Sequence, residues 1–150
     1  MPVITIGDVL DHAEQFEEAL ADYYRDVSDK TTREGVKILA DYMSRHRRHL
    51  TEGLAELPVA ERARLNTTNL RYEPQAADCR CFNGVDLAPD ATAQEVLDAA
   101  VLFDECLIRL YRQVLQQDVD QKVKDLFAGL VGREEQDEIQ LKKIKAMDYF

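Results

Sequence analysis

Two nineteen-residue stretches, VLDHAEQFEEALADYYRDV at 9–27 and VLDAAVLFDECLIRLYRQV at 96–114, decide the fold of this chain. They align without gaps at an offset of 87 residues and share ten identities. The identical pairs are Val9/Val96, Leu10/Leu97, Asp11/Asp98, Ala13/Ala100, Phe16/Phe103, Glu18/Glu105, Leu20/Leu107, Tyr24/Tyr111, Arg25/Arg112 and Val27/Val114. Shared helical composition does not produce so many matches. We therefore expect a duplicated helical hairpin whose two copies are related by a pseudo-twofold.

Start signals and apolar spacing predict two helices in the first copy. Thr5 with Asp8 forms a weak capping box for a helix that runs to about residue 28. Thr31 with Glu34 forms the same motif for a second helix, which ends at about residue 57 because Pro58 follows. These two helices make a first hairpin over about 5–57.

The second copy predicts two further helices and a long connection before them. Thr92 with Glu95 opens the third helix, which continues to about residue 117. The fourth starts after Asp118 or Asp120 and runs almost to the C-terminus, giving a second hairpin over about 92–149. The connection, about 58–91, holds three of the four prolines and the stretch VAERARL, where we expect a short helical turn. Short loops within each hairpin and one long crossover predict an all-α four-helix bundle, a single domain over 1–150.

Composition excludes several classes of protein. The chain has 150 residues, is 45% hydrophobic and 32% charged, and carries a formal net charge of −10. This balance is typical of a folded helical domain, and the negative charge argues against a nucleic-acid surface, which needs clustered Lys and Arg. The only basic cluster is Arg45, Arg47 and Arg48, which we interpret as a solvated helix face.

The sequence also indicates where the protein acts. No apolar run approaches the ~18–20 residues of a membrane span. The N-terminal stretch MPVITIGDVLDHAEQ turns acidic within eight residues, unlike a signal peptide. The three cysteines, Cys79, Cys81 and Cys106, are an odd number, which favours reduced thiols over a disulfide framework. We expect a cytoplasmic protein without a membrane partner.

A set of polar residues on the predicted helices matches the needs of a two-metal site. Such a site in a bundle takes one Glu from each of two helices and Glu-x-x-His from each of the other two. In this chain the first predicted helix offers Glu17, and the third offers Asp104. The second offers His46, and the fourth offers the pair Glu134 and Asp137. The i, i+3 spacing of the last two puts both on one helix face.

These features together resemble the ferritin-like superfamily, closest to its rubrerythrin and bacterioferritin branch. The resemblance rests on the duplicated hairpins, the crossover, a carboxylate seven residues before Tyr24 and Tyr111, and LVGREEQDEIQL at 130–141. It covers the four helices but not residues 58–91. Proteins of that kind bind two iron or manganese ions, react with oxygen or peroxide, and in some cases store iron.

The resemblance assigns a role to each candidate ligand. Glu17 and Asp104 would be terminal ligands, Glu134 a bridging ligand, and His46 and Asp137 the remaining ones.

Two positions depart from the pattern. Met43 stands where a bridging Glu is expected, and Asp137 stands where a second His is expected. Oxygen ligands suit a hard dimetal site better than a thioether, so Met43 weighs against an intact centre. The register also stays open: Glu14, Glu17 or Glu18 could face His46, and His46-x-x-His49 is a rival ligand pair.

His46 and the pair Glu134 and Asp137 each have a structural alternative. His46 fits a partly buried histidine that is hydrogen-bonded to a neighbouring carboxylate, and REEQDE at 133–138 fits a solvated segment. Cys79-x-Cys81 lacks the second cysteine pair of a zinc or rubredoxin-like module, which weakens a peroxidase interpretation.

Three functional hypotheses follow. The first is a di-iron or di-manganese carboxylate protein for oxidase, peroxide-scavenging or iron-handling chemistry. The second is a ferritin-like protein that has lost the metals and acts as a binding or structural module. In either case we expect a homodimer. A third hypothesis is a regulatory protein that contacts a partner through residues 58–91.

Overall fold

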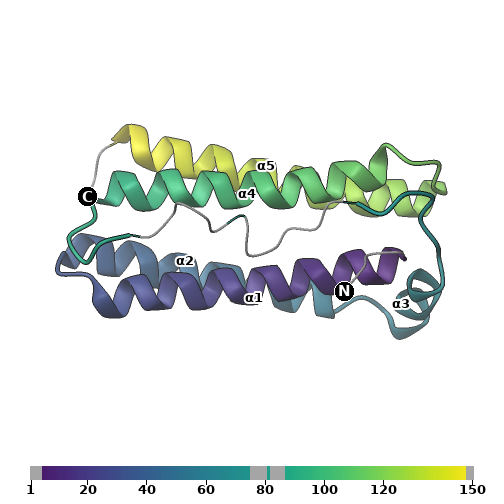
Figure 1. Cartoon of the computed structure of the whole chain (residues 1–150), viewed down its shortest axis with the longest axis horizontal. Coiled ribbons are helices and arrows are strands. Elements are labelled where there is room, and N and C mark those ends of the chain that lie inside the picture. Colours follow the sequence, from purple (N-terminus) through teal and green to yellow (C-terminus); the bar gives the residue numbers. More distant parts are fainter. Residues whose placement is uncertain (1–4, 75–80, 82–86, 148–150) are drawn as a thin grey trace.

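The chain folds as four long helices and one short helix. The computed structural model describes residues 5–74, 81 and 87–147, and its helices are α1 (Ile6–Lys30), α2 (Glu34–Ala55), α3 (Val59–Asn66), α4 (Ala93–Leu115) and α5 (Gln121–Met147). Figure 1 shows α1 and α2 as one antiparallel hairpin and α4 and α5 as a second, with the two hairpins packed along their length. The predicted all-α bundle and the short helix at VAERARL are confirmed.

The matching starts of α1 and α4 are both capped as predicted. The Thr5 hydroxyl accepts a hydrogen bond from the Asp8 amide at 3.0 Å, and Asp8 accepts one from the Thr5 amide at 3.0 Å. Thr92 and Glu95 repeat this exchange, at 3.2 and 3.3 Å. Each box satisfies amide groups that a helix N-terminus leaves without partners, which is why both helices begin directly after a threonine.

The predicted start of α2 at Thr31 is wrong, because α2 begins at Glu34. The amide of Thr31 donates to the carbonyl of Val27 at 2.9 Å, so Thr31 ends α1 instead. Its hydroxyl accepts a hydrogen bond from the amide of Arg33 at 3.1 Å and is not available to the first turn of α2. Asp120, the second of two predicted starts, precedes α5, and its carboxylate accepts from the Val123 amide at 2.9 Å.

The core forms where α1 and α4 face each other. Residues that match between the two copies are buried in both helices: Val9 and Val96, Ala13 and Ala100, Phe16 and Phe103, Leu20 and Leu107, Tyr24 and Tyr111. The rings of Tyr23 and Tyr24 meet Phe103 edge-on, with centroids 5.1 and 6.3 Å apart. Burial of each large apolar side chain contributes about 1.5–3 kcal/mol, so the matched sequence stretches form the centre of the bundle.

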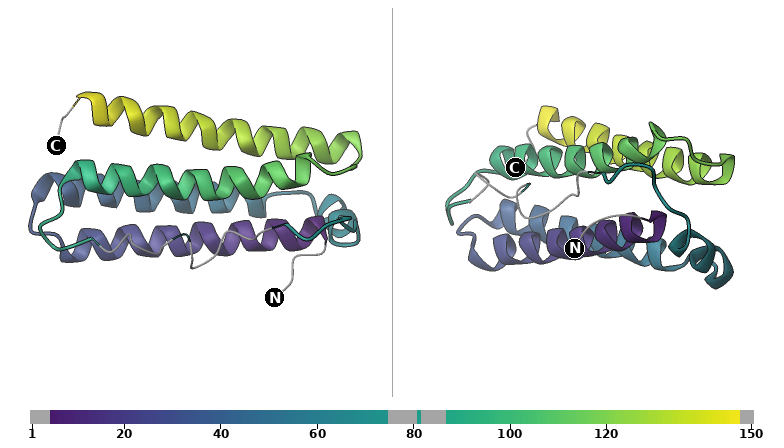
Figure 2. Two further views of the ribbon diagram at one scale, coloured as in Figure 1. Left: turned by 45° about the horizontal axis from the view of Figure 1, so that its top comes forward. Right: turned by 45° about the vertical axis from the view of Figure 1, so that its right-hand side comes forward.

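The crossover is attached to the bundle at both ends. At one end the Ile6 amide donates to the Thr68 carbonyl at 2.9 Å, and the Gln117 side chain donates to the Tyr72 carbonyl at 2.8 Å. At the other end the Thr32 amide donates to the Pro89 carbonyl at 2.9 Å. The two views of Figure 2 show α3 at one end of the bundle and the start of α4 at the other. The connection therefore spans the length of the bundle.

The prediction of reduced thiols is wrong for two of the three cysteines. Cys81 of the crossover and Cys106 of α4 form a disulfide, with Cα atoms 6.5 Å apart, and both pack against the core. Cys79 lies outside the described residues. A disulfide removes one of the grounds for expecting a cytoplasmic protein, since such bonds persist mainly in oxidising compartments. The compartment stays a prediction. No helix among the described residues is long and apolar enough to cross a membrane.

Candidate functional site

The five residues predicted as ligands come together in the middle of the bundle. Glu17 of α1, Asp104 of α4 and Glu134 of α5 are fully buried, and Asp137 is 14% exposed. Glu17 follows Phe16, and Asp104 follows Phe103, on the inner faces of α1 and α4. Glu134 and Asp137, three residues apart, project from one face of α5. The alternative of a solvated REEQDE segment is wrong for Glu134 and Asp137.

A sixth residue, Arg47 of α2, lies at the centre of this cluster. Its side chain is only 2% exposed. Its Nη1 atom is 3.1 and 3.2 Å from the two carboxylate oxygens of Glu17 and 3.0 Å from Oε2 of Glu134. Its Nη2 atom is 3.0 Å from Oδ2 of Asp137 and is also in ion-pair contact with Asp104. Each terminal nitrogen thus lies between two carboxylates.

This position of Arg47 corrects the interpretation of its neighbourhood. Arg45 is exposed, as expected of a solvated face, but Arg47 points into the core. Met43 lies one helical turn earlier on the same face and is 5% exposed. The face of α2 that turns toward the carboxylates therefore presents a thioether and a guanidinium.

His46 lies at the edge of the site. Its Nε2 atom is 2.9 Å from Oδ1 of Asp137, its side chain is 32% exposed, and its ring stacks on Tyr42 with centroids 5.9 Å apart. This is the arrangement of the structural alternative, a partly buried histidine hydrogen-bonded to a carboxylate. Metal binding by His46 stays a prediction.

The open question of register is answered by burial. Glu17 faces the site, whereas Glu14 accepts a hydrogen bond from Arg62 at 3.0 Å and Glu18 is exposed. His49 is exposed on α2, away from the cluster. Among the three glutamates, only Glu17 contributes to the site.

Burial and charge shift the ionisation of the cluster in different directions. Burial raises the pKa of Glu17 to about 8, although the charge of Arg47 works against it, and the neighbouring Glu134 raises it further. Burial also acts to raise the pKa of Asp137, but the hydrogen bond to His46 and the charge of Arg47 outweigh it, so this pKa is lowered. Burial acts to lower the pKa of Arg47, but the charges of Glu17 and Glu134 outweigh it, so this pKa is raised well above the ordinary value. Arg47 is the permanent cation of the site.

Two buried tyrosines flank the cluster. Tyr24 and Tyr111, which match in the sequence duplication, have fully buried hydroxyls without a hydrogen-bond partner among the described residues. Burial raises the pKa of both, and the carboxylates of the site add to the effect. Both are therefore neutral phenols whose rings pack in the core.

The cluster does not fit two metal ions while Arg47 keeps its position. The guanidinium occupies the space between the four carboxylates, where the ions would bind. Met43 supplies no carboxylate to bridge them. Asp104, Glu134 and Asp137 do offer oxygen atoms that all lie within 4.8 Å of one another, a spacing that suits one cation.

Comparison with known proteins identifies the fold. No protein-family model matches the sequence, and no curated protein matches it. A solved structure from Thermotoga maritima, provisionally described as a ferritin-like diiron-carboxylate protein, superposes with a TM-score of 0.63. The two sequences are 19% identical, and the match covers 97% of each chain. The chain thus has a ferritin-like fold.

Proposed function

We propose that this chain is a ferritin-like module in which Arg47 takes the place of the metal ions, and that it acts as a structural or binding protein. The observation that carries the proposal is the pairing of both terminal nitrogens of Arg47 with carboxylates from three helices. In this interpretation the carboxylates of the ferritin-like site remain, and a side chain supplies the positive charge.

Electrostatics explains why a cation is needed there. Glu17, Asp104 and Glu134 are fully buried, and several carboxylates in a bundle interior repel one another unless protons or a cation neutralise them. A guanidinium meets this need permanently, because it does not lose its proton in proteins and offers five N–H donors in a planar fork. The raised pKa of Glu17, about 8, supplies a proton as well.

Arg47 also makes metal binding costly. A metal ion would have to displace the guanidinium, which is covalently attached to α2 and so competes at a high effective concentration. Removing one partner from a buried ion pair costs about 3–5 kcal/mol, and Arg47 pairs with four carboxylates at once. We therefore favour a resting form without metal, and we propose no oxidation chemistry for it.

A second candidate function is the binding of one divalent cation. It is favoured by the three carboxylates whose oxygens converge within 4.8 Å, and by the provisional diiron-carboxylate description of the Thermotoga maritima protein. In that case Asp104, Glu134 and Asp137 would hold the ion after Arg47 moves away, and His46 would supply a nitrogen ligand from the edge.

Metal analysis separates the two candidates. The protein is incubated anaerobically with Fe(II) or with Mn(II), desalted, and its metal content measured by mass spectrometry. We expect a content indistinguishable from that of a buffer blank and a melting temperature that does not change with either metal. One ion per chain, lost in Glu134→Gln, would favour the second candidate. Two ions per chain would contradict the proposal.

An arginine variant makes the test specific. Arg47→Gln removes the cation from the carboxylates, so we expect this variant to gain a metal-dependent rise in melting temperature. Arg62→Gln is the matched control, because Arg62 also pairs with two carboxylates, Asp11 and Glu14, but lies at the periphery. Metal should have no effect on the control.

A further inference from the structure

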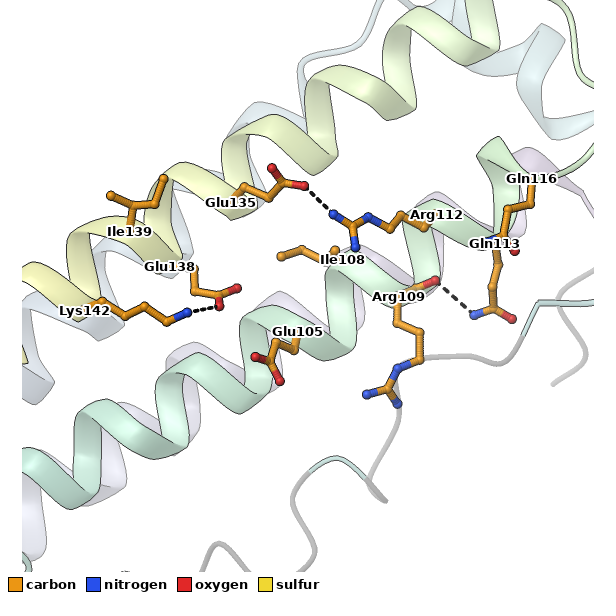
Figure 3. Close-up of a pocket in the computed structure, with 10 residues that line it drawn as sticks. All are labelled: Glu105, Ile108, Arg109, Arg112, Gln113, Gln116, Glu135, Glu138, Ile139 and Lys142. Atoms are coloured by element: carbon orange, nitrogen blue, oxygen red, sulfur yellow. Dashed lines mark hydrogen bonds and ion pairs between the residues drawn. The ribbon is translucent and has the colours of Figure 1, made fainter.

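A groove runs between α4 and α5, away from the arginine site. Figure 3 shows it lined by charged side chains of both helices, by amide side chains of α4, and by Ile108 and Ile139. Its volume is about 790 Å³. A second, more apolar hollow continues it along Val101 and Leu102 and shares two of its lining residues, Glu105 and Lys142. Together these hollows form one outer face of the second hairpin, which we call the α4–α5 face.

The charges on this face are ordered along each helix. Each helix presents two acidic residues first and two basic residues after them. On α4 these are Asp98 and Glu105, then Arg109 and Arg112, and on α5 they are Glu135 and Glu138, then Lys142 and Lys145. A helix segment with its acidic residues first and its basic residues after them is complementary to an antiparallel copy of itself.

On both α4 and α5 the side-chain charge changes from negative to positive along the helix, and the two points of change lie at the same level of the bundle. Arg112 pairs with Glu135 at 2.6 Å, near one end of the face, and Lys145 pairs with Asp98 near the other. Between these two ion pairs, the sign changes from Glu105 to Arg109 on α4 and from Glu138 to Lys142 on α5. A single twofold axis across the middle of the face can therefore serve both helices.

We propose that the α4–α5 face is the contact surface for a second copy of this chain. The axis lies in the contact plane and perpendicular to the helices, so that α4 packs antiparallel on α4 of the second copy and α5 on α5. The acidic half of each helix then faces the basic half of its counterpart. Ile139, 46% exposed, lies close to the axis and meets the same residue of the other copy.

Two kinds of interaction contribute to such a dimer. Exposed ion pairs are individually weak, and here most of these charges already have partners within the chain, so they mainly select the orientation of the second copy. The attraction comes from covering the apolar side chains of the face, including Leu102, which is 51% exposed. The resulting dimer should weaken with salt, because the charges that orient it are exposed.

The experiment reverses the charges of one half of α4 at a time. R109E/R112E makes the exposed face of α4 entirely acidic, and D98K/E105K makes it entirely basic. Sedimentation velocity of the full chain measures self-association, and native mass spectrometry identifies mixed species. K37E/R45E is the matched control for R109E/R112E, because it makes the same change in net charge at exposed positions of α2. Circular dichroism establishes that each variant keeps its helix content.

We expect the unmodified chain and the control to sediment as dimers. Each α4 variant should be monomeric alone, and an equimolar mixture of the two should form a heterodimer. A chain that is monomeric at about 0.5 mM, where even weak specific complexes form, would overturn the proposal. Dimers that survive both reversals, or a mixture without heterodimer, would exclude the packing of α4 on α4.

Discussion

Arg47 and Glu17 are hydrogen-bonded in the core, where one nitrogen of the guanidinium lies 3.1 and 3.2 Å from the two oxygens of the Glu17 carboxyl group. Despite this contact, the pKa of Glu17 is raised to about 8, because burial outweighs the charge of its partner. One guanidinium is not enough for four carboxylates. The site therefore combines a fixed cation with a proton, and its stability should respond to both.

Removing the cation should destabilise the fold strongly. We expect Arg47→Met to lower the free energy of unfolding by about 3–5 kcal/mol, since it leaves buried carboxylates without their partner. Urea unfolding followed by circular dichroism measures this at pH 7. Arg62→Met should cost about 0–1 kcal/mol, because its carboxylate partners lie nearer the surface. Equal losses in the two variants would contradict a central role for Arg47.

The proton on Glu17 predicts a pH dependence. The pKa of this carboxyl is about 8 in the folded protein and 4.5 in its ordinary state, so the folded state binds the proton more tightly. The resulting stabilisation is complete below about pH 4.5 and is lost as the pH rises through about 8. We expect the free energy of unfolding to fall by a few kcal/mol across this window.

Glu17→Gln isolates this contribution, because it keeps the hydrogen-bonding shape of the protonated acid without an ionisable group. The variant should lose most of the slope between pH 4.5 and 8, as measured by urea unfolding at several pH values. Glu18→Gln changes an exposed neighbour and should keep the slope. Asp137 acts in the opposite sense: its pKa is lowered, so its stabilisation is present above about pH 3.8 and lost in acid.

The fold could be predicted because local and repeated signals agree. The duplicated stretch placed the apolar residues of α1 and α4, and the threonine caps placed their first turns. Thr31 misled the prediction because the same residue type also ends helices, and its amide bonds to Val27. Sequence alone cannot choose between these two roles, which depend on where the chain turns.

The candidate site was only half predictable. Glu17 and Asp104 stood out because each lies seven residues before a matched tyrosine, and Glu134 because it lies three residues before Asp137. Arg47 was missed because a run of arginines on a helix is usually solvated. A usable signal was its spacing of four residues from Met43, which places it on the inner face of α2. The long side chain of Arg47 reaches all four carboxylates. Which groups it reaches depends on how the helices pack, and the sequence does not give that packing.

The disulfide should make stability depend on redox conditions. Cys81 and Cys106 are separated by 25 residues, and closing a loop of that size stabilises a fold by about 3.5 kcal/mol in the chain-entropy description. We expect C81S/C106S to lose a stabilisation of this order in urea unfolding. Cys79→Ser should keep it, and thiol titration of the unreduced protein should find one free thiol per chain. Three free thiols would contradict the bridge.

Close packing of α1 on α3 gives a local test of the crossover. A Cβ atom added at Gly7 would lie 2.7 Å from the Cα atom of Asn66, closer than real Cβ contacts. Gly7→Ala should therefore cost about 1–3 kcal/mol of unfolding free energy, because the backbone of α3 must move away. Gly129 of α5 has open space at the same position, so Gly129→Ala should be neutral or stabilise by up to about 1 kcal/mol. Similar effects at both glycines would show that α3 does not pack against α1 as described.

Two substitutions on α2 test the proposal that Arg47 takes the place of metal ions. M43E/R47A removes the guanidinium and adds a carboxylate one helical turn earlier, on the face that turns toward Glu17 and Glu134. Without a cation, the added charge should destabilise this variant further than Arg47→Ala alone, because more carboxylates then share one buried site. Mn(II) should relieve that repulsion and raise the melting temperature in proportion to the logarithm of its concentration. M43L/R47A has the same cavity without the new carboxylate and should respond less to Mn(II). If the two variants respond equally, position 43 does not face the site, and a carboxylate there does not complete a metal site.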